Sequence, residues 1–441
     1  MNELEARVQA IGRTLYDLAK REHAQLTTWN RWTKQVLAWC LADPALKNRV
    51  LRFIDCLPSL RTPSAVVQHV REYFPTVGVR LPKALRLGVS LSRGGLLTAP
   101  AVAAVVHQIV EQVARQFIAG ARPEDALAVI QRLAPRGVLV SCDLLGEQVT
   151  SEAEADEYAR RYRTFIAAIG RGCHLSIKPS SLSSRFDPLD FDGSLERAAA
   201  RLRPIAELAV QTGAALTLDM EQYEYRDLTL ALAKRLLEEP GLGERVQLGV
   251  VIQAYLRDAE AVTEELIAWL HAHHRQLAVR LVKGAYWDYE IARATQLGWP
   301  IPVYLDKRQT DQTFERVTVR LLSARDAART EIASHNVRSI SHAMAQMELL
   351  EIPKEQVEFQ LLYGMGDVIQ AAVSRLGYPV RIYTPVGELI PGMAYLVRRI
   401  LENTANESFL RQDLWEHESI EQLLSEPVPA HAVGGTGPGG P

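Results

Sequence analysis

The chain has 441 residues, of which 47% are hydrophobic and 23% are charged, and its formal net charge at pH 7 is −2. This composition is that of an ordinary globular protein, with room for two to four domains or for one large barrel with a helical extension. A net charge so close to zero gives no general attraction to polyanions, so nucleic acid is not expected as a partner.

The cysteines and the N-terminus indicate the compartment. Cys40, Cys56, Cys142 and Cys173 are far apart and include no C-x-x-C pair, so neither a disulfide framework nor a metal site is predicted. The N-terminus has no apolar signal-peptide core, and no run approaches about 20 apolar residues. We therefore expect a cytoplasmic protein that is neither secreted nor membrane-spanning.

Residues 1–130 have the pattern of helices alone. Leu15, Leu18 and Ala19 recur at helical spacing, and residues 99–119 predict a longer amphipathic helix. Prolines between positions 44 and 82 divide the region into short helices. Because it has no clustered histidines and no paired acids near a glycine turn, we expect a helical arm or platform domain.

From residue 137 the pattern changes to short β-rich runs that alternate with helical stretches, for example 153–169, 194–212 and 258–271. Eight such runs are present, at residues 137–144, 174–179, 215–221, 246–255, 276–285, 330–336, 357–365 and 380–386. Eight strands with intervening helices predict a (βα)8 barrel. We place this barrel domain at residues 131–425, followed by a flexible Pro/Gly tail at 426–441.

The carboxyl ends of barrel strands are where reactive side chains gather. Polar or charged residues occupy these ends, where a packed core would require apolar ones: Asp143, Lys178, Asp219, Glu221, Gln253, Arg280, Lys283, His335, Asn336, Gln360 and Tyr383. Any one of them could be a solvated strand end. Taken together, they predict an active site at this end of the barrel.

A predicted helix at residues 395–403 follows the eighth strand and carries Arg398 and Arg399, with Glu402 one turn beyond Arg398. One interpretation is a surface helix with an Arg–Glu pair. The other is a pair of guanidiniums that holds a small carboxylate, which arginine binds bidentately. These nine residues by themselves favour the first interpretation and leave the second open.

Six separated motifs occur along the barrel: VIQAY (251–255), VRLVKGAYWD (279–288), ASHN (333–336), EFQLLYGMGD (358–367), RIYTPVGE (381–388) and YLVRRILENTANESF (395–409). In this order they resemble bacterial proline dehydrogenases, and more narrowly the proline dehydrogenase region of the proline utilization A family. The resemblance implies a distorted (βα)8 TIM-like barrel that binds FAD and oxidises L-proline to Δ1-pyrroline-5-carboxylate. It also implies a membrane quinone as electron acceptor, and hence peripheral association with the inner membrane.

The resemblance further assigns roles to single residues. It makes Arg398 and Arg399 the anchors of the substrate carboxylate, with Lys178 as a third cation. It pairs Asp219 with both Lys178 and Arg280. The remaining substrate positions are Tyr383 and Tyr395 on the proline ring, Leu281 and Tyr286 closing the pocket, and Glu402 in an ion pair over the site. The positions expected to line FAD are Gln253, Arg280, Val282, Gly284, Tyr286, Trp287, His335, Asn336 and Gln360.

The chain departs from the family pattern at residues 303–307, where Lys307 is the residue left to meet the FAD phosphates. No ribbon-helix-helix pattern occurs in residues 1–50. The tail glycines Gly435, Gly437 and Gly440 satisfy G-x-G-x-x-G in form, but no strand precedes them. No glycine fingerprint for NAD and no cysteine beyond Cys173 is present. We therefore expect a monofunctional chain, or a fragment of a longer one, whose product goes to a separate pyrroline-5-carboxylate/glutamate semialdehyde dehydrogenase.

Two other functions stay open. Another flavin barrel, such as a methylenetetrahydrofolate reductase, would share the architecture but would have no use for the paired arginines. A degenerate barrel that serves only as an interaction scaffold would have no reason to keep the charged strand ends. A screen of bound substrates would separate the two flavin enzymes, and a visible flavin spectrum of the purified protein would separate both from the scaffold.

Overall fold

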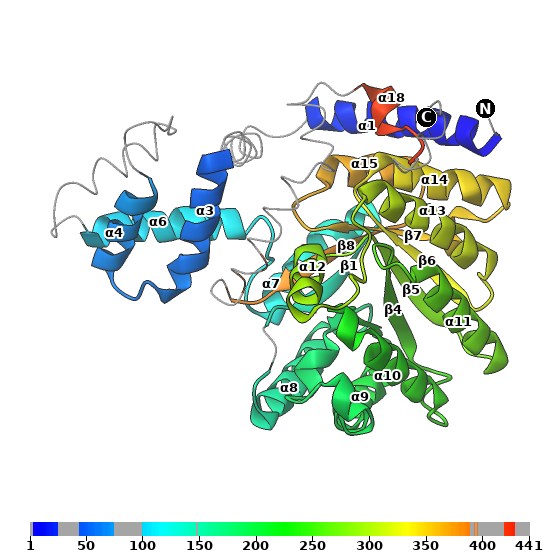
Figure 1. The fold of residues 1–441 in the computed structure, drawn as a ribbon, viewed down its shortest axis with the longest axis horizontal. Coiled ribbons are helices and arrows are strands. Elements are labelled where there is room, and N and C mark those ends of the chain that lie inside the picture. Colours follow the sequence, from blue (N-terminus) through cyan, green and yellow to red (C-terminus); the bar gives the residue numbers. More distant parts are fainter. Residues whose placement is uncertain are drawn as a thin grey trace, which may run out of the picture.

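The computed structural model describes residues 3–24, 44–74, 99–146, 149–388, 392, 395 and 419–427. Its centre is a closed barrel of eight parallel strands in chain order, which confirms the predicted fold (Figure 1). The strands are β1 (Val138–Leu144), β2 (His174–Ile177), β3 (Ala215–Leu218), β4 (Gln247–Gln253), β5 (Leu277–Val282), β6 (Ala328–Ala333), β7 (Glu358–Leu362) and β8 (Val380–Val386).

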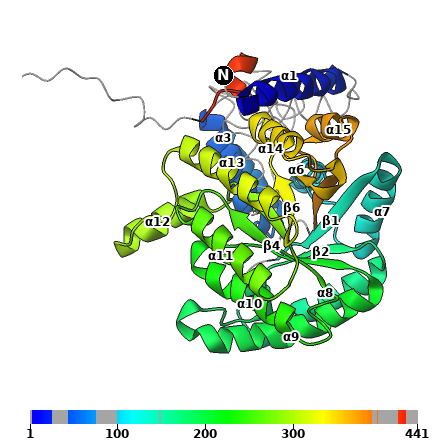
Figure 2. The same ribbon diagram turned by 90° about the vertical axis from the view of Figure 1, so that its right-hand side faces the viewer.

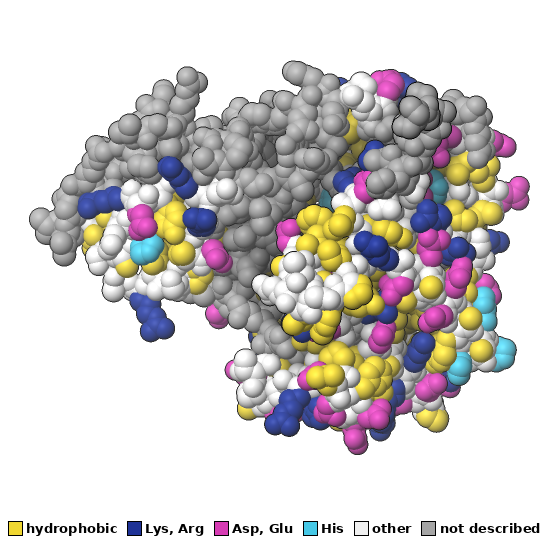
Figure 3. All heavy atoms as spheres, viewed as in Figure 1, with side chains coloured by type: hydrophobic (Ala, Val, Ile, Leu, Met, Phe, Trp, Pro, Cys, Tyr) yellow, Lys and Arg dark blue, Asp and Glu magenta, His cyan; other side chains and the backbone are white. Residues whose placement is uncertain are grey.

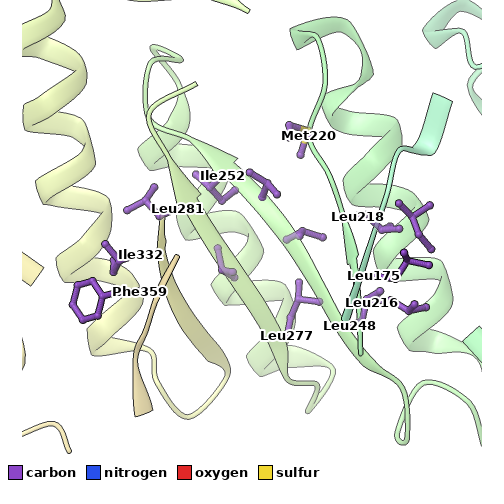
Figure 4. Packing of buried hydrophobic residues seen from close by; sticks show 14 of the residues in the cluster. Leu175, Leu216, Leu218, Met220, Leu248, Ile252, Leu277, Leu281, Ile332 and Phe359 are labelled. Carbon is purple, nitrogen blue, oxygen red and sulfur yellow. The ribbon is translucent and has the colours of Figure 1, made fainter. Parts of the chain in front are cut away.

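Side chains along each strand alternate between the barrel interior and the surrounding helices. The helix-facing positions are apolar and buried, and Figure 4 shows part of this layer: Leu175, Leu216, Leu218, Leu248, Ile252, Leu277, Leu281, Ile332 and Phe359. The inward positions instead carry many polar and charged side chains, where barrels of this class usually have branched aliphatic ones. The core that holds the barrel together therefore lies outside the strands, and the interior is polar.

Helices cover the outside of the barrel, and acidic and basic side chains are interspersed over the barrel face that Figure 3 shows. The helices after the strands are α8 (Glu152–Ile169), α9 (Phe191–Thr212), α10 (Arg226–Glu238), α11 (Ala259–Ala272), α12 (Trp287–Leu297), α13 (Lys307–Ser323), α14 (Val337–Leu349) and α15 (Asp367–Arg375). Two helices, α12 and α13, separate β5 from β6, and α12 projects from the barrel (Figure 2).

The outer face of the neighbouring strands β8 and β1 is covered by a helix that precedes the barrel. Helix α7 (Pro123–Leu133) packs against β1, β8 and α8. Two backbone hydrogen bonds join the segment before α7 to the carboxyl end of β8. They run from Ala119 N to Pro385 O at 2.9 Å and from Gly387 N to Gly120 O at 2.7 Å. The predicted domain boundary at residue 130 falls inside α7.

Two further groups of helices flank the barrel. Helix α1 (Glu3–Ala24) packs across α14 and α15, and α18 (Ile420–Leu423) lies beside it (Figures 1 and 2). Helices α3 (Pro44–Cys56), α4 (Pro63–Tyr73) and α6 (Ala99–Ala114) form a bundle beside the barrel (Figure 1). The core of this bundle continues through Phe117 and Ile118 to Leu145, next to the carboxyl end of β1. Within the described segments, every helix is too short or too polar to cross a bilayer.

Candidate active site at the carboxyl end of the barrel

Three predicted residues meet in one cluster at the carboxyl ends of the strands. Asp219, immediately after β3, accepts a hydrogen bond from Arg280 Nη1 of β5 at 2.6 Å. The hydroxyl of Tyr383, in β8, donates to the second carboxylate oxygen of Asp219 at 2.7 Å. The Arg280 guanidinium carbon lies 5.3 Å from the centre of the Tyr383 ring. Residues far apart in sequence thus form one charged and aromatic group.

Lys178 has a different direct partner from the expected one. The resemblance paired Asp219 with Lys178, but Lys178 Nζ donates to Asp143 at the end of β1, at 2.6 Å. The direct partner of Lys178, which follows β2, is therefore Asp143 on the neighbouring strand β1, while the carboxylate of Asp219 adds a weaker attraction to the same lysine. Asp143 was noted as a polar strand end without a role, and it is the residue that holds this lysine.

The protonation of the cluster follows from its burial and its charges. Burial opposes the charged form of Lys178, but the carboxylate of Asp143 raises the lysine pKa above its ordinary value. Burial also raises the pKa of Asp219, and the positive charge of Arg280 opposes that shift. Burial, together with Asp143 and Asp219, raises the pKa of Tyr383 well above its usual range. Lys178 is therefore a cation, and Tyr383 is a neutral hydrogen-bond donor.

The loop that carries Lys178 is anchored by Glu221. Its buried carboxylate accepts hydrogen bonds from the backbone N–H and the hydroxyl of Ser180, at 3.1 and 2.7 Å. The hydroxyl of Ser181 donates to the carbonyl of Lys178 at 2.7 Å. The backbone carbonyl of Glu221 also accepts from Gln253 Nε2 at 3.1 Å. One residue therefore ties the end of β3 to the residues after β2 and to the end of β4.

A second layer of charged residues lies deeper in the barrel, and sequence reasoning did not assign it a role. Glu331 of β6 and Glu358 of β7 both accept hydrogen bonds from Gln360, at 2.6 and 2.8 Å. Arg381 of β8 binds Glu358 at 2.6 Å. The pattern that could have revealed this layer is the spacing of charged residues two apart on one face of β6, at Arg329 and Glu331.

Several buried polar atoms at this end make no hydrogen bond within the described part of the chain. They are Arg280 Nε and Nη2, Gln253 Oε1 and Gln360 Oε1. Buried polar groups are normally satisfied, so these donors and acceptors are available to a bound molecule. A flavin ring carries both N–H donors and carbonyl acceptors along one edge, and the residues present fit such a group.

The segment after β5 brings backbone close to the same region. Gly284 has φ +134°, and a Cβ there would lie 2.5 Å from the ring of Tyr255, so only glycine fits. Val282 and Tyr286 are half-buried on either side of it. Trp287 is 43% exposed, and its indole N–H donates to Tyr304 O at 2.8 Å.

The other predicted cofactor residues are held by the protein itself. Lys307 Nζ lies 2.8 Å from Asp311, which also pairs with Lys283 at 2.5 Å. His335 Nε2 accepts the backbone N–H of Leu362 at 3.1 Å, which places any proton on the other ring nitrogen. Asn336 caps α14 by accepting the Ser339 N–H at 2.9 Å.

The structure does not bring Leu281 into this group. Leu281 follows Arg280 on β5, so its side chain points to the opposite side of the strand. It is fully buried in the apolar layer that faces the helices (Figure 4). Tyr395 is half-buried against the core of the helical bundle. Arg398, Arg399 and Glu402 lie outside the described residues. Among the described residues, no group of three or more His, Cys, Asp and Glu side chains is arranged to bind a metal.

The chain matches two family models: "Proline dehydrogenase" over residues 126–412 and "Proline utilization A N-terminal domain" over residues 5–117. It is 34% identical over 347 residues to "Bifunctional protein PutA" of Escherichia coli (strain K12), covering 75% of this chain and 26% of that protein. It is 33% identical over 299 residues to "Proline dehydrogenase 1" of Bacillus subtilis (strain 168), covering 67% of this chain and 89% of that protein.

Among solved structures, proline utilization A (PutA) from Bdellovibrio bacteriovorus, inactivated by N-propargylglycine, superposes with a TM-score of 0.86 and 33% identity. That match covers 100% of this chain and 45% of the Bdellovibrio chain. The chain thus spans about a quarter of the length of the Escherichia coli relative.

Proposed function

Because the chain belongs to the proline dehydrogenase family, we propose that it oxidises L-proline to Δ1-pyrroline-5-carboxylate with FAD bound at the carboxyl end of the barrel. The observation that carries this proposal is the group formed by Lys178, Asp219, Arg280 and Tyr383, beside buried donors and acceptors that the protein leaves unused. When bound there, FAD would accept a hydride from the ring carbon of proline next to the nitrogen.

The residues of this group have separate tasks in the proposal. The cation of Lys178 attracts the proline carboxylate, together with Arg398 and Arg399 of the helix predicted from the sequence at 395–403. The rings of Tyr383 and Tyr395 pack on the proline ring and limit its orientation relative to the flavin. Glu402 closes over the substrate through an ion pair.

Loss of hydride requires proline with a neutral amine. The positive charges of Lys178 and Arg280 lower the pKa of a bound ammonium, so its proton passes to solvent more readily. Tyr383 keeps its own proton because its pKa is raised by burial, so it donates to Asp219 and does not act as a base. No side chain of the group is needed as a covalent nucleophile.

Several of the described residues would hold the cofactor. Arg280 would lie against the flavin and stabilise negative charge on it, and Asp219 fixes the position of Arg280. The remaining cofactor residues of the proposal are Gln253, Val282, Gly284, Tyr286, Trp287, Lys307, His335, Asn336 and Gln360. Val282 and Gly284 would contribute backbone contacts.

The proposal includes the fate of the electrons and of the product. Electrons would pass to a quinone at the membrane surface, which requires transient contact with the cytoplasmic face of the inner membrane. The imine would go to a pyrroline-5-carboxylate/glutamate semialdehyde dehydrogenase, which we propose to be a separate enzyme. Together these steps would begin the conversion of proline to glutamate.

A lysine substitution tests the assignment of the site. Lys178→Met removes the cation and keeps most of the stem, so the KM for proline should rise about tenfold or more, as for loss of one charge-assisted contact. FAD content should stay that of the wild type. Lys354→Met, at the amino end of the barrel, is the matched control because Lys354 is exposed and bonds only Leu376 O among described hydrogen-bond acceptors. An unchanged KM in Lys178→Met would remove Lys178 from the substrate site.

A further inference from the structure

A chain of buried polar side chains runs beneath Arg280, and it begins at Glu331. Glu331 of β6 is 0% exposed. Its carboxylate lies 3.9 Å from Arg280 Nε and accepts a hydrogen bond from Gln360 Nε2 at 2.6 Å. Its other oxygen accepts from Arg329 Nη2 at 3.1 Å. Glu331 therefore contacts two residues that the proposed function places against FAD.

The chain continues to Glu358 on the next strand. Glu358 Oε1 accepts from the same Gln360 Nε2 at 2.8 Å. Arg381 grips this carboxylate with two parallel bonds, from Nε at 2.6 Å and from Nη2 at 2.8 Å. The third nitrogen of Arg381 donates to Val140 O at 3.1 Å. Charge-assisted hydrogen bonds from the buried side chains of Gln360 and Arg381 thus hold Glu358 in place.

Two carboxylates determine which way the amide of Gln360 faces. Ionised carboxylates accept hydrogen bonds and donate none, so the NH2 group of Gln360 must point toward Glu331 and Glu358. The carbonyl Oε1 then points away from them. This oxygen is buried and makes no hydrogen bond to the described residues. The amide thus presents an acceptor, and not a donor, to a molecule bound at the carboxyl end.

We propose that Glu331 is a positioning residue of the cofactor site, which locks Gln360 with its carbonyl toward an N–H of the flavin and fixes the guanidinium of Arg280. This inference rests on the proposed function, since FAD is the ligand. Asp219 contacts Nη1 of the guanidinium and Glu331 lies near its Nε, so the two carboxylates together offset the positive charge of Arg280. Without Glu331, more of the positive charge of Arg280 acts on the flavin, and the amide of Gln360 can reverse.

The substitution Glu331→Gln tests both effects on the full chain loaded with FAD. With one carboxylate fewer, the positive charge of Arg280 should shift the equilibrium between oxidised and reduced flavin about tenfold toward the reduced form. For a two-electron couple this is a rise in midpoint potential of about 30 mV. Affinity for FAD, measured by flavin fluorescence, should fall about tenfold because the amide is no longer locked. The matched control is Glu315→Gln, which removes a carboxylate paired with the buried Arg338 at 2.8 Å, away from the site. It should lower the unfolding temperature and leave the potential and the FAD affinity unchanged.

A merely structural role for Glu331 predicts a different result. If Glu331→Gln lowers stability as Glu315→Gln does, but keeps the wild-type potential and FAD affinity, the inference is overturned. If Glu331→Gln does not fold, Glu331→Asp decides, because its shorter carboxylate withdraws from Gln360. It should bind FAD at least fivefold more weakly, and unchanged affinity overturns the inference.

Whether the side-chain amide of Gln360 is held in one orientation can also be tested without flavin. In the FAD-free chain, the side-chain NH2 of Gln360 should exchange with solvent far more slowly than that of the exposed Gln356, as seen by nuclear magnetic resonance on labelled glutamine. Equal exchange of the two amides overturns the lock whether or not the chain binds FAD. Slow exchange in a chain that takes up no FAD would retain the lock and count against the proposed function alone.

Discussion

Asp219 is the single residue on which the arrangement at the carboxyl end depends most. It accepts hydrogen bonds from Arg280 and Tyr383, so Asp219→Asn leaves a buried guanidinium without its closest counter-charge. Breaking a buried pair in this way costs about 3 kcal/mol of unfolding free energy. Chemical denaturation of the FAD-free chain should show that loss.

The pair of Asp227 with Arg226 gives the matched control, because the Asp227 side chain is 69% exposed and Arg226 keeps a second partner in Asp258 at 2.6 Å. Asp227→Asn should change stability by less than about 1 kcal/mol, as surface ion pairs do. If both asparagine variants are equally stable, the Asp219–Arg280 pair is not a buried interaction of the kind described.

His342 gives the protein a dependence on pH. Burial, and then the charge of Arg338, lowers the pKa of His342 to about 4, while Glu5 opposes the shift. In the unfolded chain its pKa is about 6.5. The unfolded state therefore binds the proton first, and up to about 3 kcal/mol of stability, complete above pH 6.5, is lost as the pH falls to 4.

The variant His342→Gln should lose less stability than the wild type between pH 7 and pH 4, measured by urea denaturation. His107→Gln, at an exposed position of α6, should follow the wild type over the same range. Parallel curves for all three proteins would show that His342 does not titrate with a lowered pKa.

For single residues, the sequence indicated which side chains meet and, through the resemblance, the pair of Asp219 with Arg280, but it did not reveal the direct partner of Lys178. Lys178, Asp219, Arg280 and Tyr383 could be brought together because each lies in a predicted barrel strand and the resemblance assigns them to one site. The pairing of Lys178 with Asp143 depends on the reach of one side chain to the neighbouring strand, which the spacing of residues in the sequence does not reveal. The position of Leu281 depends on which side of β5 faces inward.

Among the elements, all eight predicted strands are present, and β8 has the predicted limits, Val380–Val386. Runs of β-branched residues bounded by turns made this possible. The role of α7 in covering β1 and β8 was not predicted, since a helix alone does not show which surface it packs on. Likewise, α1 was expected to be part of a helical arm, and its packing across α14 and α15 is tertiary information.

A buried arginine fastens α1 to the barrel. Arg338 of α14 donates to Glu5 of α1 at 2.9 Å, to Glu315 of α13 at 2.8 Å and to Leu424 O beside α18 at 2.6 Å. Arg338→Met leaves both carboxylates unpaired, so the amides of α1 should exchange with deuterium at least about tenfold faster, as for a loss of 1.4 kcal/mol or more.

The control is Arg13→Met, because the Arg13 side chain is 51% exposed and pairs with Glu421 at 3.0 Å. It should leave exchange in α1 near the wild-type rate. Equal protection of α1 in both variants would show that apolar packing alone holds this helix.

Helix α12 should be the most readily opened helix of the barrel wall. Only Glu290 and Ala294 are buried within it, whereas seven residues of the neighbouring α13 are buried. Helices with few buried apolar contacts open locally at low free energy. Deuterium exchange should therefore be at least about tenfold faster in α12 than in α13, and equal protection would contradict this.

In the molecule as a whole, the stabilising core and the chemistry occupy different sides of the same strands. Apolar residues face the helices, while opposite charges fill the interior: Lys178, Arg280 and Arg381 with Asp143, Asp219, Glu331 and Glu358. The helical bundle reaches the same end of the barrel through Ile118 and Leu145, where Tyr395 packs. A polar interior open to a charged substrate is thus compatible with a stable barrel.

The most direct test of proline oxidation by this barrel is anaerobic titration of the FAD-loaded chain with L-proline. The visible absorbance band of oxidised flavin should disappear, and one Δ1-pyrroline-5-carboxylate, detected as its o-aminobenzaldehyde adduct, should form for each flavin reduced. D-Proline at the same concentration is the control and should leave the band in place. A chain that cannot be loaded with FAD, or whose flavin stays oxidised in saturating L-proline, would contradict the proposed function.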